Sequence, residues 1–182
     1  LWSETGKIGF IGGMDVPVIE RFESGFRAGV KATNPDAEIL IGYAGNFNDP
    51  GKGKELALTQ YTQGADIIYH AAGATGLGLI EAAKEVDKYA IGVDSDQTVL
   101  DPEHVVASML KRVDNAVFTG VKDLIDGEFV ATHRELGLAE AGVGLAYSQG
   151  IEIPASIREQ VEEVKRAIVE GEIVVPGTRA EL

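Results

Sequence analysis

The stretch DIIYHAAGATGLGLIEAAKE, residues 66–85, joins an apolar run to a helix-like run through a few small residues. Its first part, DIIYHAA, is apolar after the opening aspartate except for one tyrosine and one histidine, which is typical of a strand in a parallel sheet covered on both faces. Thr75 is placed to cap a helix that continues to about Glu85. A buried strand followed by a helix is the repeating unit of an α/β fold.

Strand-like and helix-like stretches alternate on both sides of this unit. We expect further strands at residues 7–13, 38–44, 89–93 and 105–110, and helices at 18–32 and 51–63. No two of these strands are joined by a tight hairpin signal. The sequence therefore predicts a doubly wound α/β layer with a parallel sheet in residues 1–111.

Residues 112–182 show a different pattern. Apolar side chains at helical spacing predict helices at 115–125 and 154–169, and Pro154 suits the first turn of the second. A glycine-rich segment, 136–147, contains one expected strand. Because this part has few strands of its own, we expect it to belong to a body larger than the first layer.

The composition excludes several classes of function. The chain has 182 residues, and 45% of them are hydrophobic, which is enough for a sizeable core. Its formal net charge of −13 argues against a nucleic-acid partner, because phosphate binding needs clustered Lys and Arg. The absence of cysteine excludes disulfides, zinc–thiolate sites and thiol nucleophiles. No apolar stretch approaches the ~20 residues that span a bilayer, and no signal peptide is recognisable.

Polar, small and aromatic residues gather where the expected strands end. Ligands of open parallel sheets bind beyond the carboxyl ends of the strands. In order, these ends are GGMD (12–15), GNFND (45–49), GATG (73–76), DSD (94–96) and KR (111–112). The opposite ends offer only ordinary turns. We therefore expect the ligand site at the carboxyl edge.

The second of these ends lies in GNFNDPGKGKEL, residues 45–56, and places Phe47 in a polar turn. The run resembles a phosphate-binding loop, but the motif needs four residues between its glycine and a Gly-Lys-Ser/Thr, and five stand here. We predict a helix entry instead, with Asn48 or Asp49 as cap and Pro50 in the first turn. Phe47 is then free for a separate role.

Three other residues at this edge are candidates for binding. Gly73 opens GATGLG (73–78), which lacks the dinucleotide spacing, so its glycines allow close approach either of a ligand or of helix to strand. Asp94 can accept hydrogen bonds from the two hydroxyls of a sugar diol, or it can be a cap or turn residue, although Asp96 suits the cap better. Lys111 can donate to sugar oxygens, pair with Asp94, or lie solvated.

Nothing in the sequence indicates an enzyme, a cofactor or a metal. The three histidines are scattered, and His70 lies inside an expected strand, so we expect it in the core. No metalloprotease helix motif, nucleophile elbow or carboxylate–histidine metal spacing is present. We therefore expect no catalytic residue, no cofactor and no metal ligand.

The chain resembles the basic-membrane-protein, or PnrA-like, family of lipoprotein substrate-binding subunits of nucleoside ABC transporters. The matching stretches cover nearly the whole chain in order. They are KIGFIGGMDVPVIERFESGFRAGVKATNPDAEI, GNFNDPGKGKELA, QGADIIYHAAGATGLGLIEAAKE, YAIGVDSDQ, SMLKRVDNAV and LGLAEAGVGLA. The resemblance implies a type I periplasmic-binding-protein fold, in which two α/β lobes close over the ligand about a hinge.

The resemblance also implies roles for the four candidate residues. Phe47 would stack on a purine, Gly73 would contact the nucleoside through its backbone, and Asp94 and Lys111 would hold the ribose. Family members carry about a hundred further residues that form most of the first lobe and supply the second stacking aromatic. We therefore expect residues 1–111 to be the second ligand-binding lobe and residues 112–182 a segment returning to, or packing around, the first lobe of a larger protein.

The family further implies an extracytoplasmic protein that delivers adenosine, guanosine or inosine to ABC permease subunits. It would reach the membrane only through a lipid anchor absent from this chain. Two other readings stay open. One is a ligand-sensing regulatory protein with the same fold. The other is a nucleoside hydrolase, for which the first strand's end offers only Asp15.

Overall fold

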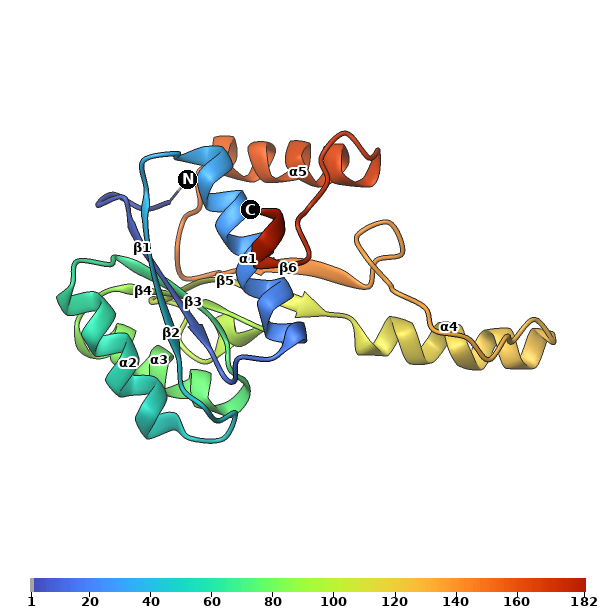
Figure 1. The fold of residues 1–182 in the computed structure, drawn as a ribbon, viewed down its shortest axis with the longest axis horizontal. Helices are drawn as coiled ribbons and strands as arrows, with labels where there is room; N and C mark the ends of the chain where they lie inside the picture. The colour runs from blue at the N-terminus through green and yellow to red at the C-terminus, as the bar shows by residue number, and fades with distance from the viewer. Residues whose placement is uncertain (1) are drawn as a thin grey trace.

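The computed structural model describes residues 2–182, and these contain one mixed sheet (Figure 1). Its strand order is β2-β1-β3-β4-β5-β6. The strands are β1 Lys7–Gly12, β2 Glu38–Tyr43, β3 Ile67–Ala71, β4 Tyr89–Gly92, β5 Val105–Lys111 and β6 Val143–Tyr147. Neighbours from β2 to β5 are parallel, while β6 is antiparallel to β5. The parallel sheet predicted for residues 1–111 is therefore confirmed.

Helices cover both faces of the sheet. They are α1 Pro17–Thr33, α2 Pro50–Thr62, α3 Gly76–Glu85, α4 Val113–Asp126 and α5 Ala155–Val169, with short 3₁₀ helices η1 Gly73–Thr75, η2 Gln97–Val99 and η3 Arg179–Glu181. Side chains of α2 and α3 pack with Ile11 and Ile68 on one face. Side chains of α1 and α5 pack with Ile8 and Val106 on the other.

The strands are apolar because each lies between these two layers. Phe10 and Ile11 are fully buried on opposite faces of β1, and Ile68 is fully buried in β3. Burying such a side chain contributes about 1.5–3 kcal/mol relative to exposing it. His70, also fully buried, lies in the core as predicted. Since neighbouring parallel strands end at one edge, the core fixes where their terminal loops meet.

Residues 112–182 divide into two parts. β6 extends the sheet, and Ile157 of α5 packs against that sheet's core. By contrast, α4 projects away from the body and has no buried residue (Figure 1). Assignment of residues 112–182 to another lobe stays a prediction, and within this segment α4 is the element that lies apart from the sheet. Within residues 2–182, no helix combines the length and apolar character that crossing a bilayer requires.

Candidate functional site

The four candidate residues line one hollow at the carboxyl edge of the sheet. Phe47, Gly73, Asp94 and Lys111 all border a cavity of about 310 Å³. Its remaining wall is mostly apolar and is formed by Val18, Ile19, Phe22, Ala71 and Val93. The hollow thus offers an aromatic ring and aliphatic side chains on one part, and a carboxylate with an ammonium on another. Such a surface suits a flat apolar ring that carries hydroxyl groups.

The contribution of α1 to this wall was not predicted from the sequence. Only a helix at 18–32 was expected there, and Phe22 of this helix also packs beside Phe10 and Phe26 in the core. The position of this helix in the sequence could have revealed its contribution. Because α1 begins at Pro17, shortly after β1 ends at Gly12, its first turns lie at the same edge as the other strand ends.

The turn that carries Phe47 is fixed by its polar residues. The Asn46 side-chain oxygen accepts a hydrogen bond from the Asn48 N–H at 2.7 Å, which closes the turn locally. The Asp49 carboxylate accepts from the Lys52 N–H at 3.0 Å and caps α2, whose first residue is Pro50. The predicted helix entry is confirmed.

Thr75 ties the same turn to η1. Its backbone N–H donates to the Phe47 carbonyl at 3.1 Å, and its buried hydroxyl donates to the Asn46 carbonyl at 3.0 Å. The hydroxyl also accepts from the Asp49 N–H at 2.9 Å. The expected helix cap is wrong in its chemistry: Thr75 stands at the N-cap position of α3, but its side chain makes no capping bond there. It stabilises the Phe47 turn instead.

Two glycines let the Phe47 turn approach the strand ends closely. A Cβ on Gly13 would lie 2.2 Å from Cδ1 of the Phe47 ring, so the ring rests on the backbone after β1. Gly73 has φ +57°, and a Cβ there would lie 3.1 Å from the Phe47 carbonyl oxygen. At Gly73 it is the Phe47 turn that approaches closely, not a helix packed on a strand, and the exposed Gly73 backbone also borders the hollow.

Asp94 and Lys111 form a pair across the ends of β4 and β5. The Lys111 Nζ lies 2.7 Å from Asp94 Oδ1, and the Lys111 backbone N–H donates to the Asp94 carbonyl at 2.9 Å. Asp94 has φ +67°, a left-handed conformation uncommon outside glycine. About half of each side chain is exposed, which leaves carboxylate lone pairs and ammonium N–H groups for a ligand.

The lysines of the glycine-rich stretch have partners other than a phosphate. Lys52 pairs with Glu55 at 2.8 Å, one turn along α2. Lys54 pairs with Glu85 of α3 at 2.7 Å. Each ammonium is thus satisfied by a carboxylate outside the hollow, which supports the rejection of the phosphate-loop reading.

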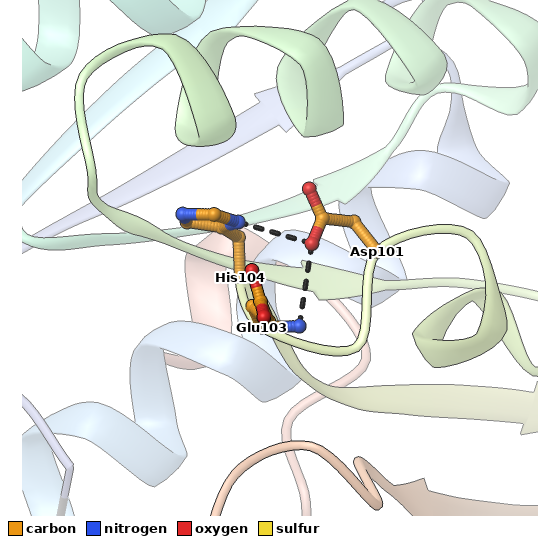
Figure 2. A group of neighbouring side chains, drawn as sticks. All are labelled: Asp101, Glu103 and His104. Carbon is orange, nitrogen blue, oxygen red and sulfur yellow. Dashed lines mark hydrogen bonds and ion pairs between the residues drawn. The ribbon is translucent and has the colours of Figure 1, made fainter.

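A second polar group lies in the turn before β5. Asp101, Glu103 and His104 offer possible metal-ligand atoms within 4.8 Å of one another, a grouping that the sequence analysis missed in the spacing D-x-E-H (Figure 2). However, the His104 Nδ1 lies 3.0 Å from Asp101 Oδ1 and must donate to it, since a carboxylate only accepts. The Glu103 N–H donates to the same oxygen at 3.2 Å. These are the contacts of a closed turn, and we assign no metal to them.

Comparison with known proteins places the chain in a family. Residues 1–179 match the family described as ABC transporter substrate-binding protein PnrA-like. Basic membrane protein D of Borreliella burgdorferi is 39% identical over 179 residues, which cover 96% of this chain and 52% of that protein. The CD4+ T-cell-stimulating antigen of Listeria monocytogenes is 41% identical and covers 97% of this chain and 54% of its own length.

Solved structures agree. A solute-binding protein of an ABC transporter system from Aeropyrum pernix has a TM-score of 0.83 at 32% identity, covering 96% of this chain and 59% of that one. A transcriptional activator of the comK gene from Bacillus halodurans has a TM-score of 0.83 at 25% identity, covering 94% and 59%. The expected α/β class with the type I periplasmic-binding-protein fold is confirmed. The chain spans about half the length of the curated relatives it matches, and it belongs to the PnrA-like family of ABC transporter substrate-binding proteins.

Proposed function

We propose that this chain is the ligand-binding lobe of an extracytoplasmic substrate-binding protein that captures purine nucleosides for an ABC permease. The observation that carries the proposal is the convergence of Phe47, Gly73, Asp94 and Lys111 on one hollow. These residues come from the carboxyl ends of four different strands, β2, β3, β4 and β5, and a purine riboside needs the two chemistries they combine. In this proposal the protein is attached to the membrane by a lipid anchor, and binding involves no enzymatic step.

Stacking supplies the base-binding part. The Phe47 ring rests on Gly13 and borders the hollow, so it can meet a purine with little loss of side-chain freedom. Base–aromatic stacking contributes about 1–3 kcal/mol per base in single-strand binding proteins. This contribution is tolerant of the base identity, so adenosine, guanosine and inosine are all candidate ligands.

Hydrogen bonding supplies the sugar-binding part. The Asp94 carboxylate accepts from the ribose hydroxyls, and the Lys111 ammonium donates to their oxygens. A site built around such groups rejects a ligand that lacks the hydroxyls, because a bare base would leave the charged pair without compensation for lost water. Ribose recognition therefore separates nucleosides from nucleobases.

The second lobe completes the site in this proposal. The hollow lies at an open edge of the sheet, and relatives are about twice as long as this chain. We propose that α4 and the loop after it belong to that other lobe, which closes over the ligand about a hinge and presents the closed form to the permease. The 182-residue chain by itself then binds nucleosides orders of magnitude more weakly than the two-lobed protein.

A nuclear magnetic resonance titration of the 182-residue chain tests the proposal, because it detects millimolar binding. Inosine, adenosine and guanosine should shift the amide signals around Phe47, Gly73 and Asp94, and hypoxanthine should shift them less. Absence of any such shift with all three nucleosides would remove the proposal.

Matched variants make the test specific. Asp94→Asn should abolish the nucleoside-dependent shifts. Asp87→Asn is the control, because Asp87 also has a left-handed backbone (φ +52°) but lies in the turn before β4, at the opposite edge of the sheet. Phe47→Leu should likewise weaken binding, whereas Phe129→Leu, at an exposed aromatic away from the hollow, should not.

A ligand-sensing regulatory protein is the second candidate. The similarity to the transcriptional activator of the comK gene favours it. With a net charge of −13, this chain is not the DNA-binding part, so a regulator would need a basic segment elsewhere in its polypeptide. Fluorescence anisotropy with duplex DNA, run on the longest polypeptide that contains this chain, separates the two functions.

A further inference from the structure

The loop that presents Asp94 is held in place by a set of partly buried hydrogen bonds. The Gln97 side-chain oxygen accepts from the Val93 N–H at 2.9 Å, directly before Asp94. The Ser108 hydroxyl donates to the Ser95 carbonyl at 2.6 Å, directly after it. The Lys111 N–H donates to the carbonyl of Asp94 itself. Together these contacts hold Asp94 in its strained left-handed conformation.

The Gln97 amide is oriented in turn by His70. Nε2 of His70 lies 2.8 Å from the same Gln97 oxygen. Because that atom already accepts from the Val93 N–H, it is the oxygen and not the amide nitrogen, so the His70 Nε2 carries the proton and donates. Gln97 is thus fixed by two donors, one from the backbone before Asp94 and one from the middle of β3.

The His70 ring itself has no freedom to turn away. It is fully buried, and a Cβ on Gly76 would lie 1.9 Å from its Nδ1 and Cε1 atoms, so the first turn of α3 packs onto the ring. Its Nδ1 has no hydrogen-bond partner within residues 2–182, as expected for the neutral form with the proton on Nε2. Burial lowers the pKa of His70 to about 4, so the ring is neutral at neutral pH.

We propose that His70 and Gln97 are positioning residues that set the Asp94 carboxylate for ribose, and thereby determine the preference for nucleosides over ligands without sugar hydroxyls. This inference rests on the proposed nucleoside site. Neither side chain needs to touch the ligand. They act by fixing the backbone at Val93, and the residue that follows, Asp94, lines the hollow.

Three variants of the 182-residue chain test this inference. Gln97→Met keeps the length of the side chain and removes the acceptor, and His70→Phe keeps the packed ring and removes the donor. His70→Gln restores a donor, because its Nε2 stands as many bonds from Cβ as the histidine Nε2 does. Gln63→Met, at an exposed glutamine, is the control for the first substitution.

The measurements are hydrogen exchange of the Val93 N–H and titrations with inosine and with 2′,3′-dideoxyinosine. We expect Gln97→Met and His70→Phe to lose protection at Val93 and to bind inosine about tenfold more weakly. Binding of dideoxyinosine should change by less than about twofold, and His70→Gln should recover inosine affinity. Equal weakening for both ligands, or no recovery in His70→Gln, would overturn the inference.

Two measurements made without ligand, amide exchange at Val93 and the carboxyl carbon shift of Asp94, separate failure of this inference from failure of the proposed function. If the unmodified chain binds neither compound, the nucleoside proposal fails. The positioning inference is then decided by exchange at Val93 and by the carboxyl carbon shift of Asp94. Changes at both positions in Gln97→Met and His70→Phe, reversed in His70→Gln, support the positioning of Asp94 by His70 and Gln97, whereas the ribose preference falls with the nucleoside proposal. Unchanged signals overturn it.

Discussion

Asp94 and Lys111 are joined twice, once by an ion pair of 2.7 Å between their side chains and once by a backbone hydrogen bond of 2.9 Å. The backbone bond connects the loop after β4 to the end of β5. The ion pair is half exposed and faces the hollow. The fold is therefore held by the backbone bond, while the ion pair is available to a ligand.

Substitution of Lys111 should separate binding from stability. We expect Lys111→Met to change the free energy of unfolding by no more than about 1 kcal/mol, because exposed ion pairs contribute little. The same substitution should weaken inosine binding about tenfold, since a charged hydrogen-bond donor is lost. Urea unfolding and a resonance titration measure the two quantities, with Lys88→Met as control. A loss of stability above 2–3 kcal/mol would show that the pair is structural.

Removal of the Thr75 hydroxyl should loosen the Phe47 turn. Thr75→Val keeps the shape of a buried side chain but loses its bonds to the Asn46 carbonyl and the Asp49 N–H. We expect a destabilisation of about 1–2 kcal/mol, together with weaker nucleoside binding. Thr59→Val removes an exposed helix hydroxyl and is the matched control for urea unfolding. Unchanged binding would mean that the turn keeps its shape without the Thr75 hydroxyl.

The sequence predicted the strands and the edge where their ends meet because each strand is an apolar run between turn residues. Phe47, Asp94 and Lys111 could be placed at that edge by their position after such runs. The antiparallel pairing of β6 with β5 could not be predicted, since its register depends on contacts between residues far apart in the chain. The same limit hid the wall residue Phe22 and the bond between His70 and Gln97.

The buried carboxylate of Glu23 in α1, which contacts Arg179 near the C-terminus, should make the stability of the fold depend on pH. Glu23 is 2% exposed and accepts hydrogen bonds from Tyr43 at 2.6 Å, Arg179 at 2.9 Å and Arg27 at 3.1 Å. Burial by itself would raise the pKa of this carboxyl, but the three donors together hold it below its ordinary value of 4.5. Its charged form therefore contributes stability that is fully present above pH 4.5 and is lost as the pH falls through the lowered pKa.

Arg179→Met should weaken this arrangement. We expect a loss of about 2 kcal/mol at pH 7, because Glu23 keeps only two of its donors. The pKa of Glu23 should rise toward its ordinary value, so less stability should be lost between pH 7 and pH 3. Chemical unfolding between pH 3 and pH 7 measures both. Arg21→Met is the control, since its partner Glu135 is exposed and their pair lies at the surface. Identical pH profiles for the two variants would contradict the assignment to Glu23.

Exposure of the apolar face of α4 should make this helix the least stable element of the 182-residue chain. Its Phe118 and Ile125 are 70% and 79% exposed, and none of its residues is buried. Isolated helices shorter than about 12–15 residues are marginal in water, and packing supplies most helical stability in proteins. We therefore expect rapid amide exchange in α4 and slow exchange in α2, measured by mass spectrometry. In a longer polypeptide that contains the other lobe, exchange in α4 should slow by at least about tenfold. Equally fast exchange in both polypeptides would remove α4 from the interface between the lobes.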